Sequence, residues 1–227
     1  MDFLEFRDYL FPSSGFQSAQ FRLIENKLGL PVNRRLKYGM QDYKNVLVID
    51  QKKLVKESEE ANSLFRLIER WLERTPFLFF KGFDFWDQYT KSVLKMLEEE
   101  ELAIKSNPNH SADDIEFHLK EHSKASNSFE ALINSEIHDK LISQQKKRLS
   151  HKATQAALLI FLYRDEPILH SPFNLLSRLM TVDELFTTWR QRHSLMVRRM
   201  IGVKIGTGGS SGHSYLQAAA EKHKIFS

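Results

Sequence analysis

The chain has 227 residues, a net charge of +4, 41% hydrophobic and 27% charged residues, and no cysteine. These values are typical of a globular protein with one well-buried core, and they exclude disulfide scaffolds, cysteine-ligated zinc or iron–sulfur sites and a cysteine nucleophile. The small charge surplus does not indicate a nucleic-acid-binding surface, because acidic residues are interleaved with the basic ones, and no apolar run reaches the roughly 18 residues of a membrane span.

Apolar residues at helical spacing dominate the chain from its start. They predict a short first helix that stops near Pro12, and a second helix that carries Phe21, Ile24 and Leu28 along one face. Gly29 follows this second helix and is the kind of residue expected at a helix C-terminus.

Two stretches depart from this pattern. Residues 31–60 are poor in helical periodicity, and within them the run "NVLVID" at residues 45–50 resembles a strand. Because a strand needs a partner and no convincing one is present, we expect a surface connection there. Residues 107–126 are polar, and we expect them to form a variable, exposed helical connection.

The polar stretch contains three histidines, His110, His118 and His122, which raises the question of a metal site. Only His118 and His122 have the i,i+4 spacing that places two side chains on one helix face, and no strongly placed third ligand accompanies them. We therefore expect the exposed helical connection rather than a metal site.

Three strong helical patterns occupy residues 62–76, 84–106 and 150–167. The first closes at Pro76, and the third begins with Ser150 as its N-cap. The residues expected to face inward are Leu64, Leu67, Ile68, Trp71, Leu72, Trp86, Tyr89, Val93, Met96, Leu97, Ala153, Ala156, Ala157, Ile160 and Phe161.

A shorter helix is expected after Pro172, and the run Thr181–Glu184 predicts a capping box that opens a further helix ending near Gly202. The expected inward stripe of that helix is Leu185, Trp189, Met196, Val197 and Met200. One more helix follows a glycine-rich segment. The count is about eight helices without a sheet, so the sequence predicts an all-α fold in a single helical domain over residues 1–227.

His193 lies on or beside the apolar stripe of this helix, between Trp189 and Met196. Two interpretations are open. The residue is either a core histidine whose ring nitrogens are satisfied by hydrogen bonds, or an axial ligand of heme iron in an apolar pocket. The pattern alone does not choose between them.

Four of the nine glycines fall in the segment Lys204–Gly212, "KIGTGGSSG". It follows a helix and precedes one, which excludes a Walker A loop and a dinucleotide fingerprint, since both need a preceding strand. The segment is either a flexible connector or a loop that lets a ligand approach the backbone, with hydroxyl donors at Thr207, Ser210 and Ser211.

Arg7 lies among Phe3, Phe6 and Leu10 on the first predicted helix. It either extends past its apolar neighbours to solvent or offers a guanidinium fork to a carboxylate within an apolar pocket. The second alternative suits a small amphiphilic anion as the ligand.

Several blocks of the sequence together resemble the tryptophan 2,3-dioxygenase family. The first is "DFLEFRDYLFPSSGFQSAQFRLIENKLG", and "WLERTP", "GFDFW", "YRDEP", "MVRRMIG" and "GTGGSSG" follow in the order found in the family. The resemblance spans almost the whole chain and implies a helical, heme-dioxygenase-like bundle that binds heme b. It also implies oxidative cleavage of the indole C2–C3 bond of L-tryptophan with O2 to N-formylkynurenine, the first step of tryptophan catabolism by the kynurenine pathway.

The resemblance implies roles for individual residues. His193 matches the proximal ligand of the heme iron, and Trp189 and Tyr215 match residues near the heme. Arg7 matches the arginine that pairs with the substrate carboxylate, and Thr207 matches the threonine at the amino-acid end of the substrate. Three further positions match the wall of the substrate pocket: Phe3, Leu10 and Ser14.

The distal histidine of the family belongs to N-terminal helices without a counterpart in these 227 residues. We therefore assign no catalytic residue and expect the chain to be a segment of a longer protein. The resemblance implies a cytoplasmic enzyme, homotetrameric when complete, that acts on L-tryptophan and O2 and binds neither nucleic acid nor membrane. The alternative is a truncated, catalytically inactive helical member of the family that acts by protein interaction.

Overall fold

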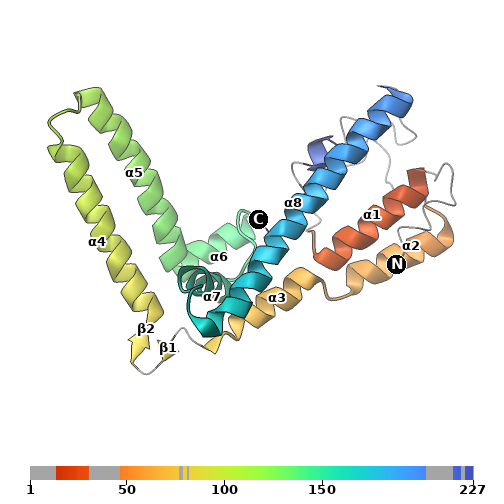
Figure 1. Ribbon diagram of the computed structural model, residues 1–227, viewed down its shortest axis with the longest axis horizontal. Coiled ribbons are helices and arrows are strands. Elements are labelled where there is room, and N and C mark those ends of the chain that lie inside the picture. The colour runs from red at the N-terminus through yellow and green to blue at the C-terminus, as the bar shows by residue number, and fades with distance from the viewer. Residues whose placement is uncertain are drawn as a thin grey trace. The chain divides into compact units, whose positions relative to one another are not determined.

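A computed structural model shows the chain to be helical (Figure 1). Its described part contains eight α-helices and a short hairpin, so the all-α prediction is confirmed. The described residues are 14–30, 47–76, 79–80, 82–202, 217–220 and 223–226. The helices are α1 (Ser14–Leu28), α2 (Ile49–Glu60), α3 (Leu64–Glu73), α4 (Phe85–Ser106), α5 (Ala112–Ile133), α6 (Ser135–Ser143), α7 (His151–Leu162) and α8 (Pro167–Ile201).

The hairpin joins two antiparallel strands of two residues each, β1 (Phe79–Phe80) and β2 (Phe83–Asp84). Gly82 lies in its turn with φ at +83°, a backbone angle that glycine adopts without a steric penalty. No sheet was expected from the sequence, and within the described residues this ladder is the full extent of the β-structure.

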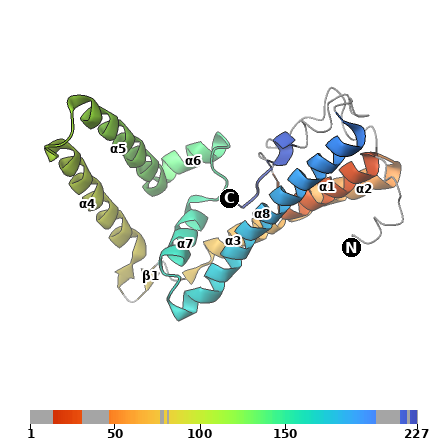
Figure 2. The same cartoon turned by 45° about the horizontal axis from the view of Figure 1, so that its top comes forward.

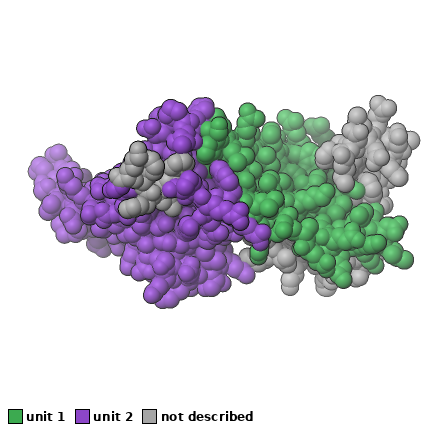
Figure 3. Space-filling model, turned by 90° about the horizontal axis from the view of Figure 1, so that it is seen from below, with its two compact units in different colours: residues 1–68, 171–227 green, residues 69–170 purple. Residues whose placement is uncertain are grey.

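The chain divides into two compact units, shown in green and purple in Figure 3. Unit 1 comprises residues 1–68 and 171–227, and unit 2 comprises residues 69–170. Helices α3 and α8 contribute residues to both units. The single domain and the variable connection at residues 107–126 stay predictions, and each unit is described by itself below.

In unit 1, helices α1 and α2 lie side by side (Figure 2). A small apolar cluster holds them together, and the amide of Asn26 on α1 donates to the Ser58 hydroxyl on α2 at 2.7 Å. Gly29 ends α1 as expected, with φ at +100°, and a Cβ there would lie 2.7 Å from Oγ of Ser63. The cluster consists of Ala19, Leu23, Leu47 and Val55.

Helix α2 is an element that the sequence analysis missed. Residues 49–60 were placed in a stretch without helical pattern, and the last two residues of the strand-like run, Ile49 and Asp50, are in fact the first two residues of this helix. The pattern failed because only Val55 and Ser58 of α2 are buried. With so few buried positions, the helix shows little apolar periodicity.

Helix α8 corrects three expectations. It is continuous through Pro172, so the two helices predicted there are one. The predicted capping box does not form, because the Thr181 hydroxyl donates to the Ser177 carbonyl one turn earlier, at 3.1 Å, within the helix. Two members of the predicted inward stripe, Leu185 and Met196, are at least half exposed.

The buried positions of α8 instead follow a different stripe along the helix. Their spacing of three, four or seven residues is that of a single helix face. Half of this face is polar or charged, which explains why apolar periodicity alone placed the inward side wrongly. The buried residues are Leu169, Leu176, Leu179, Asp183, Arg190 and Ser194.

In unit 2, α4 and α5 form a helical hairpin (Figure 1). His122 on α5 donates from Nε2 to the Leu97 carbonyl on α4 at 2.9 Å. Ser150 caps α7 as predicted, accepting from the Ala153 amide. Its hydroxyl also donates to the Glu73 carboxylate at 2.6 Å.

Inward positions in unit 2 were predicted more successfully than those of α8. Ala153, Ala156 and Ile160 on α7 are fully buried, as is Leu72 on α3. Met96 was predicted to face inward but is 54% exposed, whereas the adjacent Leu97 is buried. Among the described helices, none has the length and apolar character needed to cross a membrane.

Candidate functional site

The central part of α8 presents Trp189 and His193 together on one side of the helix. They are four residues apart, and their rings stack with centroids 5.8 Å apart and an interplanar angle of 15°. Phe21 of α1 contacts both rings, and its ring centroid lies 4.2 Å from that of Trp189 and 5.5 Å from that of His193. Phe186 stacks on Trp189 from one turn earlier, so His193 lies at the end of an aromatic cluster.

His193 has the properties of a neutral imidazole. It is half-buried among these rings, and burial lowers its pKa because desolvation disfavours the charged form. None of the described residues hydrogen-bonds to its ring nitrogens. The ligand role of His193 stays a prediction.

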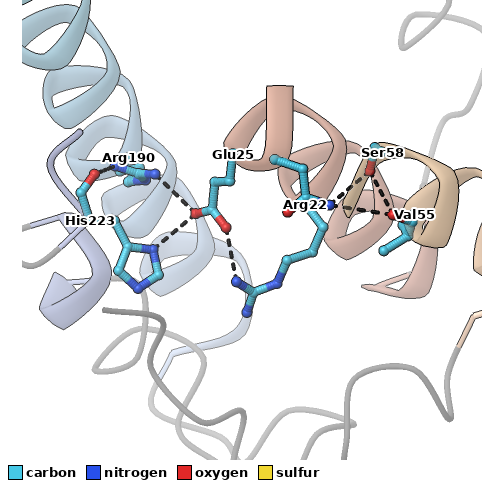
Figure 4. A network of polar contacts seen from close by, with 7 residues as sticks. Arg22, Glu25, Val55, Ser58, Arg190 and His223 are labelled. Atoms are coloured by element: carbon cyan, nitrogen blue, oxygen red, sulfur yellow. Dashed lines mark hydrogen bonds and ion pairs between the residues drawn. The ribbon is translucent and has the colours of Figure 1, made fainter. Parts of the chain in front are cut away.

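A buried ionic network lies next to this aromatic cluster and was not predicted. Glu25 of α1 is at its centre, with Oε1 accepting from Nη2 of Arg190 on α8 at 3.0 Å and from Nδ1 of His223 at 2.9 Å. Its Oε2 accepts from Nη1 of Arg22 at 2.9 Å (Figure 4). Each of the four residues is at least nine-tenths buried.

The network strongly favours the ionised form of Glu25. Burial by itself raises the pKa of this carboxyl, but the hydrogen bond from His223 and the charges of Arg22, His223 and Arg190 outweigh burial. The pKa consequently falls from 4.5 to about 2. Glu25 is therefore a carboxylate throughout the physiological pH range.

Arg190 connects the network to the C-terminal part of the chain. Its Nη1 donates to the His223 carbonyl at 2.8 Å, while its guanidinium carbon lies 4.0 Å from the centre of the Phe186 ring. Two turns earlier on α8, the buried Asp183 carboxylate accepts from the backbone N–H of Ile225 at 3.0 Å. Two separate anchors thus hold residues 223–226 against α8.

The side chains around His193 fit a ligand of a metal-containing cofactor such as heme. The imidazole is neutral, its nitrogens are not engaged by described residues, and its neighbours are aromatic rings that suit the face of a large planar group. A cluster of three or more histidine or acidic residues, as a multi-residue metal site would need, is absent from the part of the chain that the structure describes.

Of the predicted site residues, the structure brings Trp189 and His193 together. Ser14 is the first residue of α1, and its side chain is outside the description. The remaining predicted site residues lie outside the described residues: Phe3, Arg7, Leu10, Thr207 and Tyr215.

The polar residues beside the site, Glu25, Arg190 and His223, escaped the sequence analysis. Apolar periodicity did not mark Arg190, because its neighbours on the buried face of α8, Asp183 and Ser194, are polar as well. No local signal pairs Glu25 with partners 165 and 198 residues away in the chain.

Comparisons with known proteins agree with the resemblance found in the sequence. The family model "Tryptophan 2,3-dioxygenase" matches residues 1–227. The chain is 47% identical to the tryptophan 2,3-dioxygenase of Bdellovibrio bacteriovorus, 46% to that of Dictyostelium discoideum and 44% to that of Mus musculus. All of the chain is covered in each comparison, whereas it spans 63%, 57% and 55% of those relatives' lengths, respectively. A match of the family model to every residue, together with this level of identity, shows that the chain belongs to the tryptophan 2,3-dioxygenase family.

Proposed function

We propose that the chain belongs to a heme-dependent dioxygenase that cleaves the indole C2–C3 bond of L-tryptophan with O2, giving N-formylkynurenine. Membership of the family over residues 1–227 is the observation that carries this proposal. The same match favours the dioxygenase over the non-enzymatic alternative, which no described feature supports. Heme b, when bound, would supply the iron centre for the reaction of O2 with the indole.

His193 is the residue that we propose to hold the heme iron. A ligand must offer a nitrogen lone pair, and the lowered pKa of His193 keeps its imidazole unprotonated near neutral pH. Trp189 and Phe21 exclude water from one side of the imidazole and restrict its rotation. Tyr215 is proposed to lie near the heme on the strength of the family resemblance.

Tryptophan would be recognised by residues from the two ends of the chain. We propose that the Arg7 guanidinium pairs with the substrate carboxylate, since its planar fork matches the two carboxylate oxygens. Thr207 would contact the amino-acid end through its hydroxyl. The wall around the indole would include Phe3, Leu10 and Ser14.

The proposal extends to assembly and location. In keeping with the resemblance, we propose a homotetramer and a cytoplasmic enzyme, with L-tryptophan and O2 as its small-molecule partners. A chain with no cysteine fits a reducing compartment. Size-exclusion chromatography with light scattering tests the tetramer.

Reconstitution with hemin tests the ligand role of His193. We expect a Soret band that saturates at one heme per chain and that is lost or shifted in His193→Ala. His170→Ala is the matched control, because His170 is an exposed histidine on the same helix α8. An unchanged band in His193→Ala, or equal effects of both substitutions, would contradict the proposal.

Substrate binding tests Arg7. L-Tryptophan is expected to perturb the Soret spectrum of the reconstituted protein, and Arg7→Ala should weaken that response while hemin still binds. The control is Arg66→Ala, since Arg66 is exposed on α3. If tryptophan perturbs the spectra of the Arg7 variant and the wild type at equal concentrations, Arg7 does not pair with the carboxylate.

A further inference from the structure

We propose that Glu25 is a positioning residue for His193: by holding Arg190 and His223 in one buried network, it fixes the rotation of α8 that presents the His193 imidazole to the cofactor. This inference rests on the proposed ligand role of His193. Among the described residues, the hydrogen-bond partners of Glu25 are Arg22, Arg190 and His223 and do not include His193, so we infer that it acts through helix α8.

The first step of the argument is the alignment of two helices. Phe21 and Glu25 are four residues apart and therefore project from the same side of α1. Phe21 contacts Trp189 and His193, while Glu25 pairs with Arg190. Residues one turn apart on α1 thus contact about one turn of α8, from Trp189 to His193.

The second step is the difference between these two contacts. Aromatic rings 4.2–5.5 Å apart can slide or tilt at little cost, and Phe21 is tilted by 41° and 52° to its two partners. A guanidinium is a planar fork whose hydrogen bonds have fixed directions. The ion pair between Glu25 and Arg190 therefore restrains the rotation of α8 at the turn that carries Trp189 and His193, whereas the aromatic contacts leave it freer.

The third step is that Arg190 is held from two sides. Its Nη2 donates to Glu25 and its Nη1 donates to the His223 carbonyl, while His223 itself donates to Glu25. This closed set of three bonds joins α1, α8 and the C-terminal part of the chain (Figure 4). Because Arg190 directly follows Trp189 and precedes His193 by three residues, restraint of its side chain restrains the turn that carries both rings.

A purely structural role for Glu25 is the rival explanation, since losing one partner of a buried ion pair is destabilising in any location. The chain offers a matched control in Asp183. This buried carboxylate also joins α8 to residues 223–226, but it lies ten residues before His193. Asp183→Asn should destabilise the protein without rotating the turn that carries His193.

The experiment compares Glu25→Gln with Asp183→Asn in the 227-residue chain. The free energy of unfolding of each variant is measured first. Hemin affinities are then measured at denaturant concentrations at which the two variants have the same free energy of unfolding. We expect Glu25→Gln to raise the dissociation constant for hemin about 10-fold, the lower end for loss of a group that orients a ligand, and Asp183→Asn to leave it unchanged. Equal loss of affinity in both variants at matched stability would overturn the proposal.

A measurement without heme separates this inference from the proposed function. In the apo chain, the imidazole NMR signals of His193 and the indole N–H signal of Trp189 are expected to shift in Glu25→Gln and to stay in place in Asp183→Asn. Signals that stay in place in Glu25→Gln would overturn the positioning role even if His193→Ala abolishes hemin binding. Conversely, hemin binding that is unaffected by His193→Ala would refute the ligand role, whatever the NMR spectra show.

Discussion

The buried ionic network of unit 1 differs from the exposed ion pairs on helix α4 of unit 2. At the contact between α1 and α8 in unit 1, Glu25 and its basic partners are removed from water. On α4 in unit 2, Lys91 pairs with Asp87 and Lys105 with Glu101 at i,i+4 spacing, and all four side chains are substantially exposed. Solvent screens the second kind of pair and leaves it little net energy, whereas loss of one buried partner leaves an uncompensated charge.

Histidines show the same contrast. In unit 2, His122, His138 and His151 each donate from Nε2 to a backbone carbonyl, so these rings join elements of the unit through hydrogen bonds to the main chain. In unit 1, His223 instead donates to the Glu25 carboxylate. Histidine therefore takes part in a buried ionic network in unit 1 and in hydrogen bonds to backbone carbonyls in unit 2, and the predictions below test this difference.

The largest effect is expected from truncating the buried carboxylate. Glu25→Ala leaves Arg190 and Arg22 without their shared anion, and we expect the free energy of unfolding to fall by about 3–5 kcal/mol. Glu101→Ala on α4 is the comparison, and its denaturation midpoint should equal that of the wild type. Chemical denaturation monitored by circular dichroism measures both. Similar losses in the two variants would remove the contrast between the units.

Acid should weaken unit 1 through the same carboxylate. The pKa of Glu25 is 4.5 unfolded and about 2 folded, so below pH 4.5 the unfolded chain takes up a proton that the folded chain does not. The stabilisation is complete above pH 4.5 and is lost as the pH falls toward 2, by about 3 kcal/mol. Glu25→Gln lacks this titration, so its unfolding free energy should fall less between pH 5 and 2. Parallel pH profiles for the two proteins would contradict the lowered pKa.

A smaller loss is expected from the histidines of unit 2 that donate to backbone carbonyls. His138 is fully buried and its Nε2 donates to the Leu149 carbonyl at 2.9 Å. His138→Ala creates a cavity and leaves this acceptor unsatisfied, which should cost about 2–4 kcal/mol. The half-buried His122 is the control, and His122→Ala should cost about 1 kcal/mol. Thermal denaturation measures both variants, and the midpoint of His138→Ala should be the lower of the two. A lower midpoint for His122→Ala would show that burial does not determine the loss of stability.

The smallest effect is expected at a helix end. Ser111 caps α5, accepting from the Asp114 N–H at 3.2 Å, and Ser111→Ala should cost about 1 kcal/mol. Ser123→Ala, at an exposed position inside α5, should cost nothing, because alanine is the better helix former. Urea denaturation compares the two. Indistinguishable midpoints would show that the cap does not contribute to stability.

Much of the local structure followed from the sequence. The all-α class, the end of α1 at Gly29, the cap at Ser150 and the buried alanines of α7 were predicted because each depends on residues within a turn or two. The pairing of Trp189 with His193 was also accessible, since i,i+4 spacing places both on one helix face. The family blocks added predicted roles for the heme ligand and for the substrate-binding residues, and most of these residues lie outside the described part of the chain.

The remaining features depended on contacts between distant parts of the chain. Helix α2 shows little apolar periodicity. Helix α8 is continuous, although Pro172 and the run Thr181–Glu184 each predicted the start of a separate helix. The inward face of α8 carries Asp183 and Arg190, which any hydrophobic pattern assigns to the solvent side. Periodicity is a property of neighbouring residues and can be read from them, but burial of a charge becomes favourable only when folding brings its partners to it, and Glu25 meets Arg190 from 165 residues away.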